Sequence, residues 1–144
     1  MPRRRGRRRL HAAVAVIERR GRILICQRHD RDSFGGCWEF PGGKREPSES
    51  WETCLRRELR EELGVAVRLI RPYGRMRHQF KDGTVFFRVF RCTIAQGIPR
   101  PLDAQALQWV RADELKQYRF PPANRELIEQ LSCEQRHDII RASQ

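Results

Sequence analysis

The sequence has no long hydrophobic run, no closely spaced pair of cysteines and very little lysine. No apolar stretch among the 144 residues approaches the roughly 20 residues that a membrane-spanning helix needs, so none is expected. The arginine-rich start leads into an alternating segment, unlike the apolar core of a signal peptide. The five cysteines are odd in number and widely spaced, so neither a disulfide framework nor a zinc site is predicted. Such cysteine usage is typical of a reducing compartment, and we expect a cytoplasmic protein.

Positive charge is concentrated at the start of the chain. The formal net charge is +12, and six of the positive charges are arginines within the first nine residues. Residues 1–9 have no apolar periodicity, so we predict a disordered arm there, followed by one domain over residues 10–144. These arginines can contact nucleic-acid phosphates. The chain has 27 arginines against three lysines, which indicates a general bias and leaves nucleic-acid contact as a secondary hypothesis.

Apolar residues recur along the chain with two different spacings, one typical of strands and the other typical of helices. Strands are predicted over residues 11–17, 22–27, 65–70, 75–80, 84–94 and 106–110, with a short extended piece over 38–40. Helices are predicted over residues 48–63, over 112–118, and from a cap at Asn124 to 131 or 140. The central helix has an apolar residue at every fourth position, namely Trp51, Leu55, Leu59 and Leu63. This order predicts an α+β fold, an α/β/α sandwich with a central mixed sheet.

The central helix also carries three carboxylates on one side. Glu58, Glu61 and Glu62 are spaced i, i+3 and i+4, which places them within roughly 100° around the helix axis. Like charges at these spacings cost about 0.2–0.5 kcal/mol per pair, and the last turn of a helix favours cations. On a helix face selected only for solubility, positive and negative side chains would alternate. We therefore interpret the three carboxylates as ligands of a divalent cation, and Mg²⁺ fits because it prefers oxygen ligands.

The surrounding residues extend this pattern to a specific motif. The segment GKREPSESWETCLRRELREELGV, residues 43–65, matches G-x(5)-E-x(7)-R-E-[apolar]-x-E-E-x-G-[apolar] at every fixed position. This pattern is the Nudix box, so the chain resembles Nudix hydrolases. The flanking segments WEFPGGK (residues 38–44) and FPPAN (residues 120–124) resemble the MutT branch of that family. The resemblance covers about residues 10–132 and implies the family's α/β/α sandwich.

The resemblance implies a reaction and its catalytic residues. Members of the MutT branch use Mg²⁺, for which Mn²⁺ can substitute, to hydrolyse a nucleoside triphosphate to a monophosphate and pyrophosphate. By position, Glu58, Glu61 and Glu62 would bind the metal, and one of them, or a water between them, would act as the base. The backbone carbonyl of Gly42 or Gly43 would supply a further oxygen ligand.

The remaining catalytic and substrate-binding residues are also implied by the resemblance. Glu49 and Arg57 would form an internal pair that fixes the loop onto the helix. Five residues outside the central motif are candidate substrate contacts: Arg28, Glu39, Phe40, Phe80 and Asn124. Several have ordinary structural alternatives, because an arginine can be a surface residue, a phenylalanine can pack in the core and an asparagine can cap a helix.

The expected substrate is an oxidised guanine nucleotide such as 8-oxo-dGTP, or dGTP, which implies a role in sanitation of the nucleotide pool. This expectation rests on Phe40 and on the donor and acceptor of the Asn124 amide. CTP or a modified dCTP is the alternative, because relatives with that preference resemble the first strands almost as well and tend to carry Asp where Asn124 stands. One departure is Gln108, at a position that is acidic in MutT. A neutral amide cannot accept the proton, and Asp103 is a candidate replacement.

Overall fold

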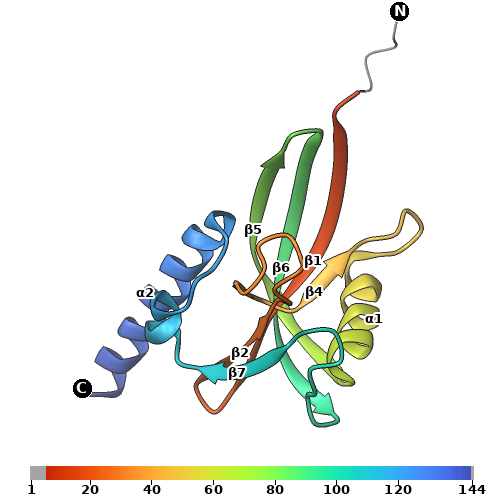
Figure 1. Ribbon diagram of the computed structural model, residues 1–144. Coiled ribbons are helices and arrows are strands. Elements are labelled where there is room, and N and C mark those ends of the chain that lie inside the picture. Colours follow the sequence, from red (N-terminus) through yellow and green to blue (C-terminus); the bar gives the residue numbers. More distant parts are fainter. Residues whose placement is uncertain (1–5, 144) are drawn as a thin grey trace, which may run out of the picture.

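A mixed β-sheet with helices on both sides forms the fold of this computed structural model, which describes residues 6–143 (Figure 1). Within those residues the strand order is β3-β2-β1-β6-β5, with β4 paired to β1 and β7 paired to β2. The strands are β1 (Arg8–Arg19), β2 (Arg22–Gln27), β3 (Trp38–Glu39), β4 (Gly42–Lys44), β5 (Ala66–Phe80), β6 (Gly83–Gln96) and β7 (Ala106–Val110). The helices are α1 (Trp51–Leu63), η1 (Ala112–Gln117), η2 (Pro122–Asn124) and α2 (Arg125–Ala142). The predicted α+β sandwich with a mixed sheet is confirmed.

Strand β1 lies at the centre of the sheet and supplies both layers of the core. Successive side chains of a strand point to opposite faces of a sheet. On one face Ala13 and Ile17 pack with Leu59 of α1, while on the other Val16 packs with Leu127 of α2. Residues 13–17 of β1 are therefore covered by a helix on both faces, which explains why this part of the strand is an unbroken apolar run.

Strand β1 runs parallel to β6 over ten pairs, from Arg8 beside Gly83 to Ile17 beside Cys92. Its other edge is shared between two antiparallel partners, because β4 pairs with residues 12–14 and β2 pairs with residues 18 and 19. Strand β1 therefore brings β4 and the segment that precedes α1 against the middle of the sheet.

Two strand predictions need correction. The strands predicted over residues 65–70 and 75–80 form one strand, β5, in which irregularities on either side of Pro72 and Gly74 absorb the residues that look like a break. Strand β4 was not predicted, because Pro41 and two glycines are typical of a turn. Its partner, the middle of β1, is about 30 residues away in sequence.

The N-terminal boundary also differs from the prediction. Residues 1–5 of the predicted arm lie outside the described residues. Arg8 and Arg9, predicted to be disordered, belong to β1, because Gly83 and Thr84 of β6 supply backbone partners for them. The segment predicted as a helix over 112–118 is the 3-10 helix η1. No helix of the described chain is long and apolar enough to cross a membrane.

Candidate catalytic site

Helix α1 presents its carboxylates to the backbone of β4. The helix begins at a capped position, where the Ser50 hydroxyl accepts a hydrogen bond from the Thr53 N–H at 3.1 Å, and it ends at Gly64 with φ 72°. The Glu62 carboxylate accepts a hydrogen bond from the Gly42 N–H at 3.1 Å. A Cβ at Gly43 would overlap the Glu58 carboxylate. Glycine at position 43 therefore lets the β4 backbone and the acidic face of α1 lie in contact.

Arg57 organises the polar groups around this contact. Its guanidinium donates two hydrogen bonds to Glu49, at 2.7 and 2.8 Å, and one to the Lys44 carbonyl at 3.1 Å. It also donates to Glu58 at 2.9 Å and, more weakly, to Glu61 at 3.5 Å. One side chain thus ties the loop before α1 to two carboxylates of the predicted metal site, and the expected pairing of Glu49 with Arg57 is present in the structure.

The carboxylates of the site differ in their electrostatic surroundings. Burial raises the pKa of Glu62 to about 8 against the lowering effect of the Gly42 N–H, and the negative charges of Glu58, Glu39 and Asp103 raise it further. Burial also raises the pKa of Glu58, although Arg57 opposes that shift. Buried carboxylates that repel one another are stabilised in their charged form by a cation.

The residues of the site fit a divalent metal without being arranged around one. Among residues 6–143, no three His, Cys, Asp or Glu side chains meet closely enough to hold a metal ion. The reason is local, because Arg57 engages Glu58 and Glu61 while Glu62 is held by Gly42. All the available donors are oxygens, and two of the carboxylates lie against a glycine backbone that leaves no room for another side chain. This donor chemistry is the one that hard divalent cations prefer.

A second polar group is formed by Arg28, which directly follows β2, and by Glu39 at the end of β3. Arg28 forms an ion pair with Glu39 at 2.9 Å and donates to the Ser33 carbonyl at 2.8 Å. The negative charges of Glu39 and Asp103 also raise the pKa of Glu62. Gln108, the neutral residue on β7, is exposed. Glu39 is therefore paired with Arg28, and its charge acts on Glu62.

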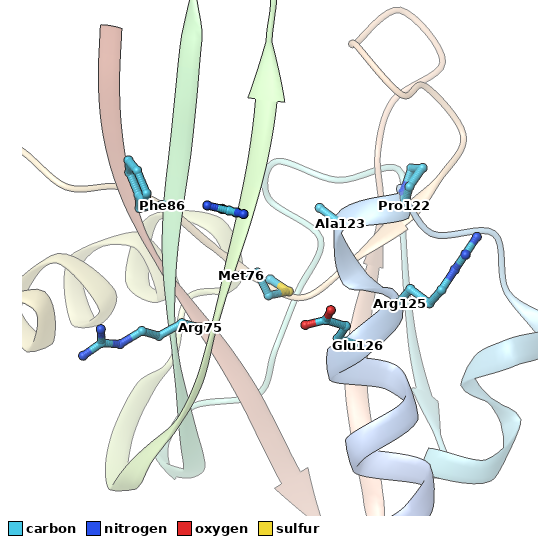
Figure 2. Close-up of a pocket in the computed structure, with 8 residues that line it drawn as sticks. Arg75, Met76, Phe86, Pro122, Ala123, Arg125 and Glu126 are labelled. Atoms are coloured by element: carbon cyan, nitrogen blue, oxygen red, sulfur yellow. The ribbon is translucent and has the colours of Figure 1, made fainter. Parts of the chain in front are cut away.

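A cavity of about 610 Å³ lies between the outer strands and the start of α2 (Figure 2). In Figure 2, Met76 of β5 and Glu126 of α2 point toward each other across it. Apolar and charged side chains both line it, namely Arg75, Met76, Arg77, Phe86, Pro122, Ala123, Arg125 and Glu126. Sequence analysis did not single out Arg77 and Glu126. The only available signal was the alternation of charged and apolar residues along β5.

The predicted base contacts do not line this cavity. Phe40 is only 4% exposed and packs on Phe120, with ring centroids 5.2 Å apart. Asn124 is 9% exposed, and its amide donates to the Pro121 carbonyl at 3.3 Å. Its side chain makes no capping hydrogen bond to α2, so the predicted cap is not formed. Phe80 ends β5 and is half-buried. Asn124 nevertheless directly follows Ala123 of the cavity wall.

Comparisons with known proteins agree with this geometry. The NUDIX domain family matches residues 12–130. The chain is 34% identical over 120 residues to the CTP pyrophosphohydrolase of Escherichia coli K12, covering 83% of this chain and 89% of that protein. It is 37% identical over 120 residues to the putative 8-oxo-dGTP diphosphatase 2 of Mycobacterium tuberculosis, covering 83% and 85%. The crystal structure of the MutT NUDIX hydrolase from Burkholderia pseudomallei is similar, with 31% identity and a TM-score of 0.78 over 86% of this chain and 98% of that one.

Proposed function

The chain belongs to the Nudix hydrolase family, and we propose that it converts nucleoside triphosphates to monophosphates and pyrophosphate. The observation that carries this proposal is the contact between α1 and β4. There Glu58 and Glu62 lie against a glycine backbone, and the pair formed by Arg57 and Glu49 holds the loop in place. Charged groups gathered at such a contact are suited to a polyanionic phosphate chain once a cation is present.

Nudix hydrolases need a divalent metal, and we infer Mg²⁺ for this chain. Glu58, Glu61 and Glu62 would hold it, together with the carbonyl of Gly42 or Gly43. When bound, the metal neutralises phosphate charge and aligns the phosphates for displacement. The protein's own part is to hold these ligands in register and to accept a proton from the attacking water at one of the three glutamates.

The names of the relatives support two substrate classes. One similar protein is named as an 8-oxo-dGTP diphosphatase and another as a CTP pyrophosphohydrolase. We propose 8-oxo-dGTP or dGTP as the first candidate, with the base recognised near Asn124, and CTP or a modified dCTP as the alternative. Arg28, Glu39, Phe40 and Phe80 stay proposed substrate contacts. Contact of Arg28 or Glu39 with substrate would require their mutual ion pair to open.

Pyrophosphate release tests this proposal directly. The purified protein should release pyrophosphate from one of 8-oxo-dGTP, dGTP, CTP and 5-methyl-dCTP with Mg²⁺, and a ranking at equal concentration identifies the base. Glu62→Gln should lower kcat by about 10²–10⁴-fold while the far-ultraviolet circular dichroism spectrum stays unchanged. Arg136→Gln, on the exposed face of α2, is a matched control. Full activity of Glu62→Gln would contradict the assignment of the carboxylates.

Two further proposals concern location and partners. Four of the five free cysteines are buried, which supports a reducing compartment such as the cytoplasm. A nucleic-acid-binding role through the arginines of residues 1–9 is a secondary proposal. It predicts that replacing Arg3, Arg4 and Arg5 by Gln in the full chain weakens retention on single-stranded DNA and leaves pyrophosphate release unchanged.

A further inference from the structure

Three strands project beyond the start of α1, and the first residue of that helix, Trp51, packs at one end of the face they carry. In Figure 1 the first part of β1, the end of β5 and the start of β6 extend together away from both helices. Their register places His11 of β1 beside Phe86 of β6, and Phe86 beside Arg77 of β5. Residues directly opposite one another on paired strands share a face of the sheet. This face lies on the side of α1, since Ala13, two residues after His11, packs with α1.

Aromatic rings and guanidinium groups alternate on this face. The rings of His11 and Phe86 are stacked with centroids 5.6 Å apart, and His11 meets the edge of Trp51 at the same distance. Arg88 lies 4.7 Å from the Trp51 ring, and Arg9 lies 6.0 Å from the Phe86 ring. We call these residues the arginine–aromatic face: Arg9, His11, Trp51, Arg77, Phe86 and Arg88.

The arginines of this face have no counter-charge in the described part of the chain. Arg9, Arg77 and Arg88 are exposed, and none of them forms an ion pair within residues 6–143. By contrast, Arg28, Arg57 and Arg91 each pair with glutamate. The six residues of the arginine–aromatic face include no carboxylate, although Arg77 and Phe86 also border the cavity that Glu126 of α2 lines. The positive charges of this face repel one another, and a bound anion would offset this repulsion.

We propose that the arginine–aromatic face binds single-stranded nucleic acid. Exposed guanidinium groups bind phosphates, and partly exposed rings stack on bases that are not already paired in a duplex. Trp51 belongs to α1, and the guanidinium groups of Arg45 and Arg88 lie over its ring. The stacked rings of His11 and Phe86 on the strands therefore offer room for about one or two nucleotides. This surface is separate from the acidic contact between α1 and β4, so it extends the proposed hydrolase function and does not rest on it.

The test is fluorescence anisotropy with a twelve-residue oligo-dT that carries a 3′ fluorescein. Its 5′ end is a hydroxyl, so no triphosphate is offered to the catalytic site, and EDTA removes divalent metal. Three arginine contacts predict that log Kobs falls with log[salt] at a slope of about −2.1. The double variant Arg9→Gln, Arg88→Gln should weaken binding by about tenfold and reduce the slope to about −0.7. Hydrolysis of the preferred nucleotide should be unchanged, because neither residue belongs to the proposed catalytic site.

Two controls distinguish this surface from other sources of binding. Arg136→Gln on α2 removes an exposed arginine elsewhere and should leave the affinity unchanged. When Arg3, Arg4 and Arg5 are replaced by Gln, the affinity for the oligonucleotide should still depend mostly on Arg9 and Arg88. The proposal is overturned if the oligonucleotide does not bind at 50 mM salt, or if the double variant binds like the parent. It is equally overturned if duplex DNA or heparin binds as tightly as the single strand, because a general polyanion surface would then explain the result.

Discussion

Arg57 and Glu49 are joined by two parallel hydrogen bonds, from Nε to Oε2 at 2.7 Å and from Nη2 to Oε1 at 2.8 Å. These bonds lower the pKa of Glu49 to about 2, so the pair remains charged at neutral pH. Because Arg57 also contacts Glu58, the position of the loop before α1 is coupled directly to a carboxylate of the proposed metal site. The pair therefore links the fold of the loop to the proposed chemistry.

Replacing Arg57 by Lys should impair catalysis although it preserves the charge. A lysine cannot make two parallel hydrogen bonds to one carboxylate. We expect kcat to fall and the effects of Arg57→Lys and Glu49→Gln to be non-additive, with a coupling of about 0.5–3 kcal/mol. A double-mutant cycle on kcat/KM measures this coupling. Additive effects would show that the two residues act independently.

The variant Gly43→Ala should reduce activity more than it reduces stability. The new Cβ would overlap the Glu58 carboxylate and displace it from the β4 backbone. Gly74→Ala is a matched control on β5, because its Cβ would meet only the end of the Gln130 side chain, at 3.8 Å. We expect full activity from Gly74→Ala. Equal activity of the two variants would mean that the place of Glu58 beside Gly43 is unimportant.

Stability in EDTA should decrease with rising pH through Glu62. The pKa of this carboxyl rises from its ordinary 4.5 to about 8 on folding, so the folded state favours the protonated form. The contribution of Glu62 to stability is therefore complete below pH 4.5 and is lost as the pH rises to about 8. Thermal unfolding between pH 5 and 8.5 should show this loss in the parent protein and not in Glu62→Gln. Millimolar Mg²⁺ at pH 8 should reverse it, and identical pH profiles of the two proteins would contradict the assignment.

Asn124→Ala should change discrimination among bases as well as stability. Its amide bonds to the Pro121 carbonyl beside the cavity, so the loss costs about 0.5–1.5 kcal/mol of stability. If Asn124 also contacts the base, kcat/KM falls more for the preferred nucleotide than for the others. A uniform decrease for all nucleotides would limit Asn124 to a structural role. Glu126→Gln, two residues further on, tests whether the cavity itself takes part in base recognition.

One thiol should react quickly in the native protein. Cys133 is exposed and the other four cysteines are buried. Burial raises the pKa of Cys92 to about 12, which keeps it in the unreactive thiol form. Ellman's reagent at pH 8 should label one thiol in the native state and five in guanidinium chloride, and Cys133→Ser should remove the fast phase. A second fast thiol would contradict the packing of the core.

Local features of the sequence were predictable and long-range ones were not. The end of α1 at Leu63 and the spacing of its carboxylates depend on residues within 15 positions of one another, although the helix begins at Trp51 and not at residue 48 as predicted. The pairing of Glu49 with Arg57 followed from the resemblance to the family. The single strand β5 depends on pairing with β6, which absorbs the irregularities around Pro72 and Gly74. Phe40 is buried by Phe120, 80 residues away, and no local pattern distinguishes that packing from base stacking.

The parallel pairing of β1 with β6 has a consequence for how the chain folds. Residues 8–17 of β1 each pair with a residue 75 positions further on, so the centre of the sheet depends on contacts that close a long loop. At a synthesis rate of about 5–20 residues per second, β1 waits roughly 4–15 s before β6 has been made. During that interval β2 and β4 pair with one edge of β1, and the edge that β6 will cover stays unpaired and open to pairing with another chain.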